Sequence, residues 1–377
     1  MLNCKFISII VLLSLILCIP AYAQPEATNS KSAILIESDT GEVLYKQDAD
    51  VRLPIASVTK IMTLCLIFDK MEAGQFNGED IVTVSDNAAG MGGSQVFLEA
   101  GGKYAVNDLI KCIIVASAND ACVAMAEYVS GSQSAFVELM NQKASQLNMN
   151  NTNFVNCTGM PAKGHYSSAE DVAIMSCELV KHEEFFNYSS IWMDEIEHSG
   201  GRVTGLTNTN KLVRFFDGCD GIKTGYTNEA GHCISATVKK GNMRLISVII
   251  GGETSQGRFD DARDLINYGF ANYEKRSLGS EVELPQSIAL CDGMEKSILI
   301  KTIGDQYKVI GKSDADRVSY KINLPERINA PVKEGEIIGS VDFMLNGEKI
   351  GEIKIVVSQN GSKATVEQYF NKLAQQW

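Results

Sequence analysis

The sequence predicts an α+β protein in which an antiparallel sheet carries a helical lobe and a small all-β domain follows. Strand-like runs lie near both ends of the region before residue 276, and helix-like apolar segments lie between them. From about Ser277, short alternating runs are separated by Gly, Asn and Asp, which is typical of an all-β domain. With 377 residues, 45% of them hydrophobic and 21% charged, the chain is long and apolar enough for two folded domains.

Residues 1–23 have the pattern of a secretory signal peptide. Lys5 precedes the apolar run Phe6–Ile19, and Ala21-Tyr22-Ala23 follows as a cleavage sequence. An uncleaved anchor is the alternative, and a bulky residue before Cys18 argues against a lipoprotein. Cleavage would remove one lysine and no acidic residue, so the net charge would change from −12 to −13. This acidic balance argues against a nucleic-acid partner.

The cysteines and histidines give no pattern of a metal site. The chain has ten cysteines, two of them in the predicted signal segment. An exported chain can use cysteines in disulfides, but Cys65, Cys112, Cys122 and Cys177 lie in helix-like apolar segments, which favours free buried thiols. There is no C-x-x-C pair and no H-E-x-x-H motif. We therefore expect no metal and no cofactor.

Residues 24–276 are predicted to form the first domain. Ala33–Gln47 contains two strand-like runs around Asp39-Thr40-Gly41, and His232–Gly252 contains two more around Lys240-Gly241-Asn242, so both predict hairpins. Helices are expected over Ser57–Ala73, Val106–Val115, Ala121–Val129, Ser134–Leu147, Ser168–Lys181 and Arg258–Tyr273. One sheet that holds both ends of the domain, with the helices beside it, is the most economical arrangement.

Residues 277–360 are predicted to form the β-rich second domain. Its strands are expected over Tyr307–Ile310, Val318–Ile322, Glu336–Phe343 and Lys349–Val357. Residues 361–377 then place their apolar side chains on one helical face: Val366, Tyr369, Phe370, Leu373 and Trp377. This amphipathic helix is a candidate membrane anchor, and docking on the β-domain is the alternative.

A serine and a lysine three residues apart stand near the start of the first expected helix. Ser57 and Lys60 lie in "RLPIASVTKIMT", after Pro54 and before the apolar run that begins at Ile61. A helical side chain three residues further on lies on the same face, so Lys60 can reach the Ser57 hydroxyl. Backbone N–H groups at a helix start can also face a developing negative charge. The alternative is that Ser57 is a plain N-cap.

Two further motifs follow in chain order. Ser-x-Asn occurs at Ser85, Ser117 and Ser358. Ser117-Ala118-Asn119 joins two apolar helical runs. A loop between two core helices can hold side chains in fixed orientations, so we select Ser117 and Asn119 as candidate site residues. Ser85 instead opens a glycine-rich loop, and Ser358 lies in the β-rich domain. Lys223-Thr224-Gly225 stands ahead of a strand, where it places a cation, a hydroxyl and a glycine along one sheet edge.

These motifs resemble those of the D-alanyl-D-alanine carboxypeptidases among the low-molecular-weight penicillin-binding proteins. Ser-x-x-Lys, Ser-x-Asn and Lys-Thr-Gly, in this order, are shared by penicillin-binding proteins and class A β-lactamases. The stretches "VASAND", "FVNCTGMPAKGHYSSAEDVA" and "DGIKTGYTNEAGHC" extend the resemblance over about residues 32–273. It implies a penicillin-binding/β-lactamase-like transpeptidase fold for the first domain. Ala144 stands where the glutamate of a class A β-lactamase would be, which favours the peptidase.

The resemblance also implies roles for these residues. Ser57 would attack the carbonyl between the last two D-alanines of a peptidoglycan stem peptide and form an acyl-enzyme. Lys60 would act as the base, kept neutral by burial and by the nearby Lys223 cation. Ser117 would relay a proton to the leaving D-alanine, and Asn119 would hold the substrate amide.

The strand motif would bind the end of the substrate. Lys223 and Thr224 would bind its terminal carboxylate, and Gly225 would allow the backbones to approach closely. The backbone N–H of Tyr226 would complete an oxyanion hole with that of the nucleophile. Arg258 is a further candidate for the carboxylate, and a surface ion pair on the closing helix is its alternative.

The resulting prediction is an exported serine-type D-Ala-D-Ala carboxypeptidase that β-lactam antibiotics inhibit. Its partners would be the stem peptide, β-lactams and a membrane surface at the terminal helix, and not nucleic acid. It would work outside the cytoplasm, at the outer face of the cytoplasmic membrane and the cell wall. A β-lactamase and a non-catalytic penicillin-sensing or wall-binding protein are the alternatives, and endopeptidase activity is a variant of the first prediction.

Overall fold

The computed structural model describes residue 27 and residues 29–368. The predicted signal peptide, residues 1–23, lies outside the described residues, and so do residues 369–377 of the predicted terminal helix. Within the described part of the chain, no helix is both long and apolar enough to cross a membrane.

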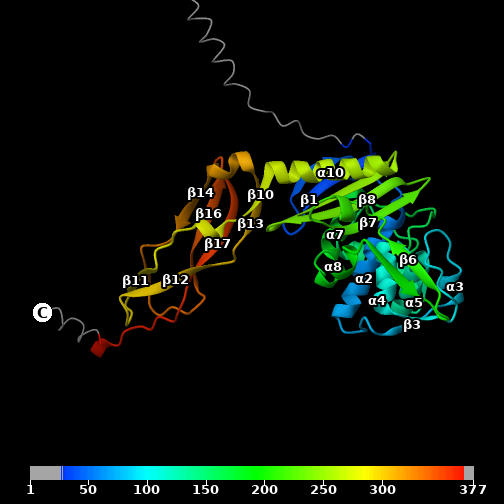
Figure 1. Cartoon of the computed structure of the whole chain (residues 1–377). Helices are drawn as coiled ribbons and strands as arrows, with labels where there is room; N and C mark the ends of the chain where they lie inside the picture. The colour runs from blue at the N-terminus through cyan, green and yellow to red at the C-terminus, as the bar shows by residue number, and fades with distance from the viewer. Residues whose placement is uncertain (1–26, 28, 369–377) are drawn as a thin grey trace, which may run out of the picture.

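A five-stranded antiparallel sheet forms the centre of the first part of the chain, in the order β2-β1-β9-β8-β7 (Figure 1). The sheet brings both ends of this part together, as the sequence predicts, because β1 pairs with β9. β7 lies at one edge of the sheet. The strands are β1 (Ser32–Glu37), β2 (Val43–Gln47), β7 (Cys219–Thr227), β8 (Gly231–Lys240) and β9 (Met243–Gly252).

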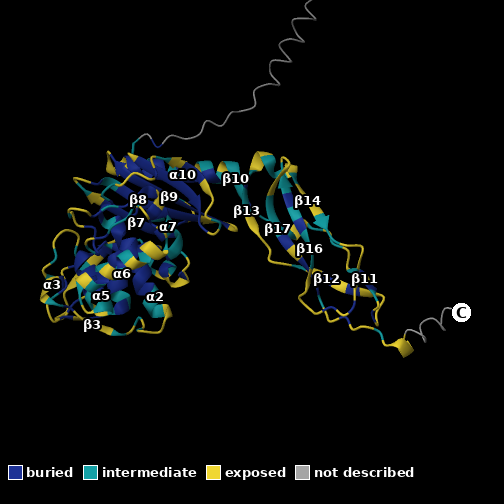
Figure 2. Ribbon diagram, turned by 180° about the vertical axis from the view of Figure 1, so that it is seen from behind, coloured by how far each residue is buried: buried dark blue, intermediate teal, exposed yellow. Residues whose placement is uncertain are grey.

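Both faces of this sheet are covered. Successive side chains of a strand point to opposite faces. In β1, Ile34 and Ile36 join the core of the helical lobe, whereas Ala33 and Leu35 join a second core beside α10 (Ser255–Asn272). Because the sheet is the middle layer between α10 and the lobe, every residue of β1 and of β9 is buried (Figure 2).

The helical lobe contains five of the six helices that the sequence predicts, together with several short ones; the sixth is α10. Ser132 and Ser168 cap α6 and α7 with side-chain oxygens that accept backbone N–H groups at 3.2 and 3.1 Å, which explains where these helices begin. The helices are η1 (Ala56–Thr59), α2 (Lys60–Glu72), α3 (Asp86–Ala89), α4 (Val106–Val115), α5 (Asn119–Ser130), α6 (Gln133–Gln146), α7 (Ala169–Leu179), η2 (Glu183–Phe185), α8 (Phe186–Ser189) and α9 (Leu212–Phe215).

Two small strand pairs lie beside the lobe, and the sequence predicted only a short strand-like run at Ile81–Val84, without its partner. β3 (Ile81–Thr83) pairs with β4 (Lys103–Ala105), and β5 (Met193–Glu197) pairs with β6 (Val203–Thr207). Strands this short carry too little alternation of apolar and polar residues to be distinguished from loops.

After α10 the chain forms a β-rich unit. β10 (Tyr273–Ser277) pairs with β13 (Tyr307–Gly311), and a six-stranded sheet follows in the order β14-β16-β17-β12-β11-β15. Its core includes Val341, Phe343 and Ile355, which are almost fully buried. The elements are η3 (Gly279–Glu281), β11 (Ser287–Cys291), β12 (Ser297–Ile303), η4 (Lys312–Arg317), β14 (Val318–Asn323), β15 (Arg327–Asn329), β16 (Ile337–Leu345) and β17 (Glu348–Val357).

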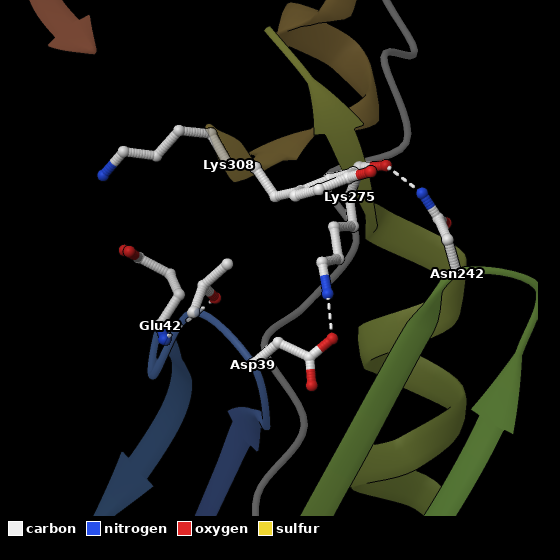
Figure 3. A pocket seen from close by; sticks show the side chains of 7 residues that line it. Asp39, Glu42, Asn242, Lys275 and Lys308 are labelled. Carbon is white, nitrogen blue, oxygen red and sulfur yellow. Dashed lines mark hydrogen bonds and ion pairs between the residues drawn. The ribbon is translucent and has the colours of Figure 1, made fainter. Parts of the chain in front are cut away.

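Lys275 of β10 ties the two parts of the chain together (Figure 3). Its ammonium group lies 3.1 Å from a carboxylate oxygen of Glu37 and also pairs with Asp39, next to β1. Asn242 donates a hydrogen bond of 3.1 Å to the Lys275 carbonyl. Burial lowers the pKa of Lys275, but its hydrogen bonds to Asp39 and Glu37 outweigh burial, so the pKa is raised. Asp39, Asn242 and Lys275 line a cavity of about 510 Å³ at the junction.

The eight cysteines in the described residues are free thiols, and six of them are buried. Cys65, Cys112 and Cys122 pack inside the helical lobe as small apolar side chains. Burial raises the pKa of Cys177 to about 12 and that of Cys233 to about 11, so these two thiols stay protonated at neutral pH.

Candidate active site

Ser57 lies in the short 3-10 turn η1, directly before α2. The sequence predicted an ordinary helix start here. The tighter 3-10 turn changes which side chains lie above one another. With three residues per turn, side chains at i and i+3 lie one above the other. The Lys60 ammonium nitrogen is therefore 3.0 Å from the Ser57 hydroxyl oxygen. The N-cap of this turn is Ile55, and Ser57 makes no capping hydrogen bond, so the plain N-cap interpretation does not hold.

Lys60 is fully buried and has three hydrogen-bonding neighbours. Besides Ser57, its Nζ contacts Asn119 Oδ1 at 2.7 Å and the Thr158 carbonyl oxygen at 2.8 Å. Burial lowers the pKa of Lys60, and the nearby Cys122, Cys157 and Asp120 only partly oppose this effect. A neutral amine has two hydrogens and one lone pair. The hydrogens can go to Asn119 and Thr158, which leaves the lone pair facing the Ser57 hydroxyl.

The loop between α4 and α5 carries Ser117 and Asn119. Ser117 has a φ of 61°, in the left-handed region, and is almost fully buried. Its hydroxyl makes no hydrogen bond within the part of the chain that the structure describes. Asn119 is more constrained, because its Nδ2 donates to the Gly92 carbonyl at 2.7 Å while its Oδ1 accepts from Lys60. One amide hydrogen of Asn119 is left for a ligand.

The strand β7 brings Gly225 against the turn that holds Ser57. A Cβ atom at position 225 would lie 2.9 Å from the Ser57 backbone nitrogen and 2.9 Å from the Ile55 carbonyl oxygen. Only glycine allows two backbones to approach this closely without a shift. The Ser57 N–H and the β7 edge therefore lie side by side.

Lys223 and Thr224 stand on β7 just before this contact. Lys223 is buried, and its Nζ donates to the Thr224 carbonyl at 3.1 Å. Burial holds the pKa of Lys223 well below its usual value, and repulsion by Lys60 and Arg258 adds to this. The Thr224 hydroxyl donates to Thr209 Oγ1 at 2.8 Å. An incoming carboxylate would supply the negative charge that Lys223 lacks.

Arg258, near the start of α10, is buried and is not a surface ion-pair partner. Its Nη1 donates to the backbone carbonyls of Gly225 at 2.9 Å and Cys233 at 3.2 Å, and its Nε is buried without a partner among the described residues. Burial lowers the pKa of Arg258 to about 10. The guanidinium group thus hydrogen-bonds to both β7 and β8 and adds positive charge beside Lys223.

The Tyr226 side chain lies outside this arrangement. The residue is 55% exposed, and its ring stacks on the His232 ring at a centroid distance of 4.4 Å. Its hydroxyl donates to Asn228 Oδ1 at 3.0 Å. Only the Tyr226 backbone, next to Gly225, remains available for the reaction centre.

The sequence patterns of two known families match this chain. Residues 20–254 match a family described as D-alanyl-D-alanine carboxypeptidase, and residues 273–363 match the C-terminal domain of penicillin-binding protein 5. The chain belongs to the D-alanyl-D-alanine carboxypeptidase family. It is therefore a low-molecular-weight penicillin-binding protein, and its mixed helix-and-sheet fold with a C-terminal β domain agrees with the predicted fold class.

Relatives of this carboxypeptidase cover most of its length. The D-alanyl-D-alanine carboxypeptidase DacF of Bacillus subtilis is 38% identical over 353 residues, which is 93% of this chain and 90% of that protein. DacA of Escherichia coli is 35% identical over 88% of this chain and 83% of its own. The crystal structure of penicillin binding protein 5 from Haemophilus influenzae superposes with a TM-score of 0.76 at 30% identity, covering 90% of this chain and 99% of that one.

Three groups that shape the candidate site were not predicted from the sequence. The carbonyls of Thr158 and Gly92 accept hydrogen bonds from Lys60 and Asn119, and both lie in loops without a periodic pattern. The Asp120 carboxylate accepts the Val96 and Leu98 N–H groups at 3.1 and 3.0 Å, which holds the loop after Gly92 in place. Asp120, directly after the Ser-x-Asn motif, was the local sequence feature that could have indicated how this loop is held.

Ser85, the other Ser-x-Asn serine near the lobe, lies elsewhere. Its hydroxyl caps the short helix α3 by accepting the Ala88 N–H at 3.0 Å, and it donates to Glu127 at 2.6 Å. Both hydrogen bonds are structural, and neither involves Ser57 or Lys60.

Proposed function

We propose that Ser57 is the nucleophile with which this carboxypeptidase removes the terminal D-alanine from peptidoglycan stem peptides. One observation carries the proposal: the buried Lys60 amine lies 3.0 Å from the Ser57 hydroxyl and makes no hydrogen bond or ion pair with a carboxylate of the described residues. A lysine in this environment can be neutral, and a neutral amine can take the serine proton.

In the acylation step, the Ser57 oxygen bonds to the carbonyl carbon of the penultimate D-alanine. Lys60 takes the hydroxyl proton, and the Ser57 and Tyr226 N–H groups donate to the oxyanion. The peptide C–N bond then breaks. A proton passes from Lys60 through Ser117 to the leaving amine, and D-alanine departs. Asn119 uses its remaining amide hydrogen to hold the substrate backbone.

The terminal carboxylate directs this step to the end of the peptide. Lys223 and Thr224 bind it at the free edge of β7, and its charge raises the pKa of Lys223 so that this lysine is a cation in the complex. Arg258 supports the same charge from the buried side. Water then attacks the ester carbonyl, the ester C–O bond breaks, and Ser57 regains its proton, with Lys60 as the base that activates the water.

A β-lactam would acylate the same serine, because its ring amide takes the place of the scissile bond. The chain would act outside the cytoplasm on the cell wall, after cleavage of residues 1–23. We further propose residues 24–276 as the catalytic domain and 277–360 as the β-rich domain. Residues 361–377 were expected to form the terminal helix, but residues 361–364 hydrogen-bond to the β-rich unit at Val332 and Asp292. Only the chain after them, where Val366 is 76% exposed, would lie on the outer face of the membrane.

D-Alanine release from diacetyl-Lys-D-Ala-D-Ala tests the reaction and the nucleophile together. We expect release by the 24–377 protein and none by its Ser57→Ala variant, with labelled penicillin bound covalently only to the former. Penicillin bound at Ser57 without peptide cleavage would instead indicate a penicillin-sensing protein. Rapid hydrolysis of penicillin would indicate a β-lactamase.

A further inference from the structure

Two cysteines of the helical lobe, Cys122 and Cys157, lie against each other near Lys60. Cys122 Sγ lies 3.2 Å from the Cys157 carbonyl oxygen and 4.0 Å from Thr63 Oγ1. Cys157 Sγ accepts a hydrogen bond of 3.6 Å from Gln133 Nε2. Both cysteines are fully buried. The contact joins α5 to the loop before α7, so it forms only when these two segments pack together.

The two thiols differ in how readily they ionise. Their side chains hydrogen-bond to each other, and this bond, together with burial, raises the pKa of Cys157 well above its usual value. Burial also raises the pKa of Cys122, but the hydrogen bond with Cys157 leads the contributions that oppose burial, so the pKa of Cys122 is lowered. The thiolate is the reactive form of cysteine. Cys122 is therefore the more reactive thiol, and Cys157 is the partner that it contacts.

Other buried cysteines of the lobe lack such a partner. Burial raises the pKa of Cys65 and that of Cys112. Cys65 Sγ donates to the Met175 carbonyl at 3.4 Å. Within the part of the chain that the structure describes, neither of these two thiols hydrogen-bonds to another cysteine. They are buried to the same extent as Cys122 and therefore provide matched controls.

The cysteine pair lies next to the two groups that hold Lys60. Cys122 follows Asn119 by one turn of α5, and Cys157 directly precedes Thr158. Asn119 Oδ1 and the Thr158 carbonyl oxygen lie 2.7 and 2.8 Å from Lys60 Nζ. In a disulfide the two sulfur atoms are about 2.05 Å apart. Closing this bond would pull α5 and the loop toward each other, and both acceptors of Lys60 would shift.

We propose that Cys122 and Cys157 are an oxidation site, at which a hydroperoxide closes a disulfide that slows the reaction of Ser57. The Cys122 thiolate attacks one peroxide oxygen, the O–O bond breaks, and the leaving hydroxide takes up a proton as water. Cys157 then attacks the sulfur of the resulting sulfenic acid. The S–O bond breaks, and the hydroxide leaves with the Cys157 proton as a second water.

The two thiols thus lose two electrons, which reduce the peroxide to two waters. Both thiols are buried, so the site is suited to a small oxidant such as hydrogen peroxide. The effect on Ser57 rests on the proposed function, whereas the disulfide does not.

Mapping the disulfide tests the oxidation site by itself. The 24–377 protein would be treated with hydrogen peroxide, its remaining thiols alkylated, and its peptides analysed by mass spectrometry. We expect a cross-linked peptide that contains Cys122 and Cys157 and that dithiothreitol separates. The Ser57→Ala protein should form it equally well, because the serine takes no part in the oxidation. Cys122→Ala should form none, and Cys112→Ala should form it as the parent does.

The rate of Ser57 acylation by labelled penicillin tests the effect on the site. We expect the oxidised protein to react roughly 10- to 100-fold more slowly than the reduced protein, because small displacements of a reacting group are costly. Dithiothreitol should restore the rate, which separates the disulfide from methionine oxidation, since methionine sulfoxide needs an enzyme for its reduction. Each variant is compared with its own untreated form, and peroxide should leave the rate of Cys122→Ala unchanged.

The outcomes separate this proposal from the proposed function. Two thiols that are both still alkylated after peroxide treatment, or a Cys122 that gains oxygen without a cross-link, would overturn the oxidation site. A mapped disulfide with an unchanged acylation rate would overturn its effect on Ser57. A mapped disulfide in a protein whose Ser57 penicillin never acylates would support the oxidation site and contradict the proposed function.

Discussion

The proposed active centre and the junction between the two parts of the chain each bury a lysine, and the two lysines differ in their partners. Lys60 contacts an amide oxygen, a carbonyl and a hydroxyl, whereas Lys275 contacts the carboxylates of Glu37 and Asp39. Burial without a paired carboxylate lowers the pKa of Lys60, and two carboxylates raise that of Lys275. The partners of a buried amine thus decide whether it can act as a base or is held as a structural cation.

Replacing the base should give the largest effect. In Lys60→Met the Ser57 hydroxyl loses its proton acceptor, and we expect kcat/KM for D-alanine release to fall by about 10²- to 10⁴-fold. The rate of penicillin acylation should fall with it. Lys46→Met, an exposed lysine on β2, is the control and should keep full activity. Unchanged acylation of the Lys60→Met protein would mean that another group activates Ser57.

Replacing Lys275, the structural cation, should lower the stability of the fold. Lys275→Met leaves the fully buried Glu37 carboxylate without its cation, which should cost about 3–5 kcal/mol in the free energy of unfolding. Urea unfolding in a Trp377→Phe background measures it, because Trp192 then reports on the first part of the chain. Adding Glu37→Gln should recover most of the loss. A single variant as stable as the parent would show that the pair contributes nothing.

Close approach of two backbones is a further feature of the proposed active centre. Gly225→Ala places a Cβ 2.9 Å from the Ser57 nitrogen, so β7 and the nucleophile turn must separate. We expect penicillin acylation to slow by roughly 10- to 100-fold, corresponding to an overpacking cost of about 1–3 kcal/mol. Gly205→Ala on β6 is the control, since a Cβ there meets nothing within 4 Å. If the two variants react equally fast, close approach at position 225 has no role in catalysis.

The smallest predicted effect is on the pH dependence of stability. The pKa of Lys60 is lowered in the folded protein, so between that pKa and the ordinary 10.5 the unfolded chain binds more protons, and Lys60 makes stability rise with pH. Lys275 has a raised pKa, so its stabilisation is complete below 10.5 and is lost as pH rises through the raised value.

The two lysines should therefore give opposite slopes. Urea midpoints measured from about pH 7 to about pH 11 should decline more steeply with pH in Lys60→Met than in the parent. In Lys275→Met combined with Glu37→Gln the alkaline decline should be shallower. Equal slopes in all three proteins would contradict the assignment of the two pKa shifts.

Local sequence patterns were enough to predict much of the fold. The alternation in Ala33–Gln47 and His232–Gly252 predicted both hairpins, and the apolar periodicity of Val106–Val115 predicted α4 with the same bounds. Four strands of the sheet were predictable because strand-like runs stood at both ends of one region. β7 was missed, because Lys223-Thr224-Gly225 was expected ahead of a strand and lies within one. The pair β5–β6 was missed because its strands are short and largely exposed.

The sequence by itself determined which chemical groups could react. The spacing from Ser57 to Lys60 places both on one side of a single turn, and this follows from local backbone geometry alone. Gly225 was also identifiable as a position of close backbone approach. Such features depend on neighbours in the chain, which the sequence displays directly.

Only the tertiary structure decided the environment of those groups. It brought the Thr158 carbonyl and Asn119 to Lys60, buried Arg258 behind β7, and set Glu37 against Lys275. These contacts join residues far apart in the chain, so they exist only after the layers have packed. Burial and long-range partners determine a pKa, and for that reason the lysine proposed as the base and the structural lysine became distinguishable only in the folded protein.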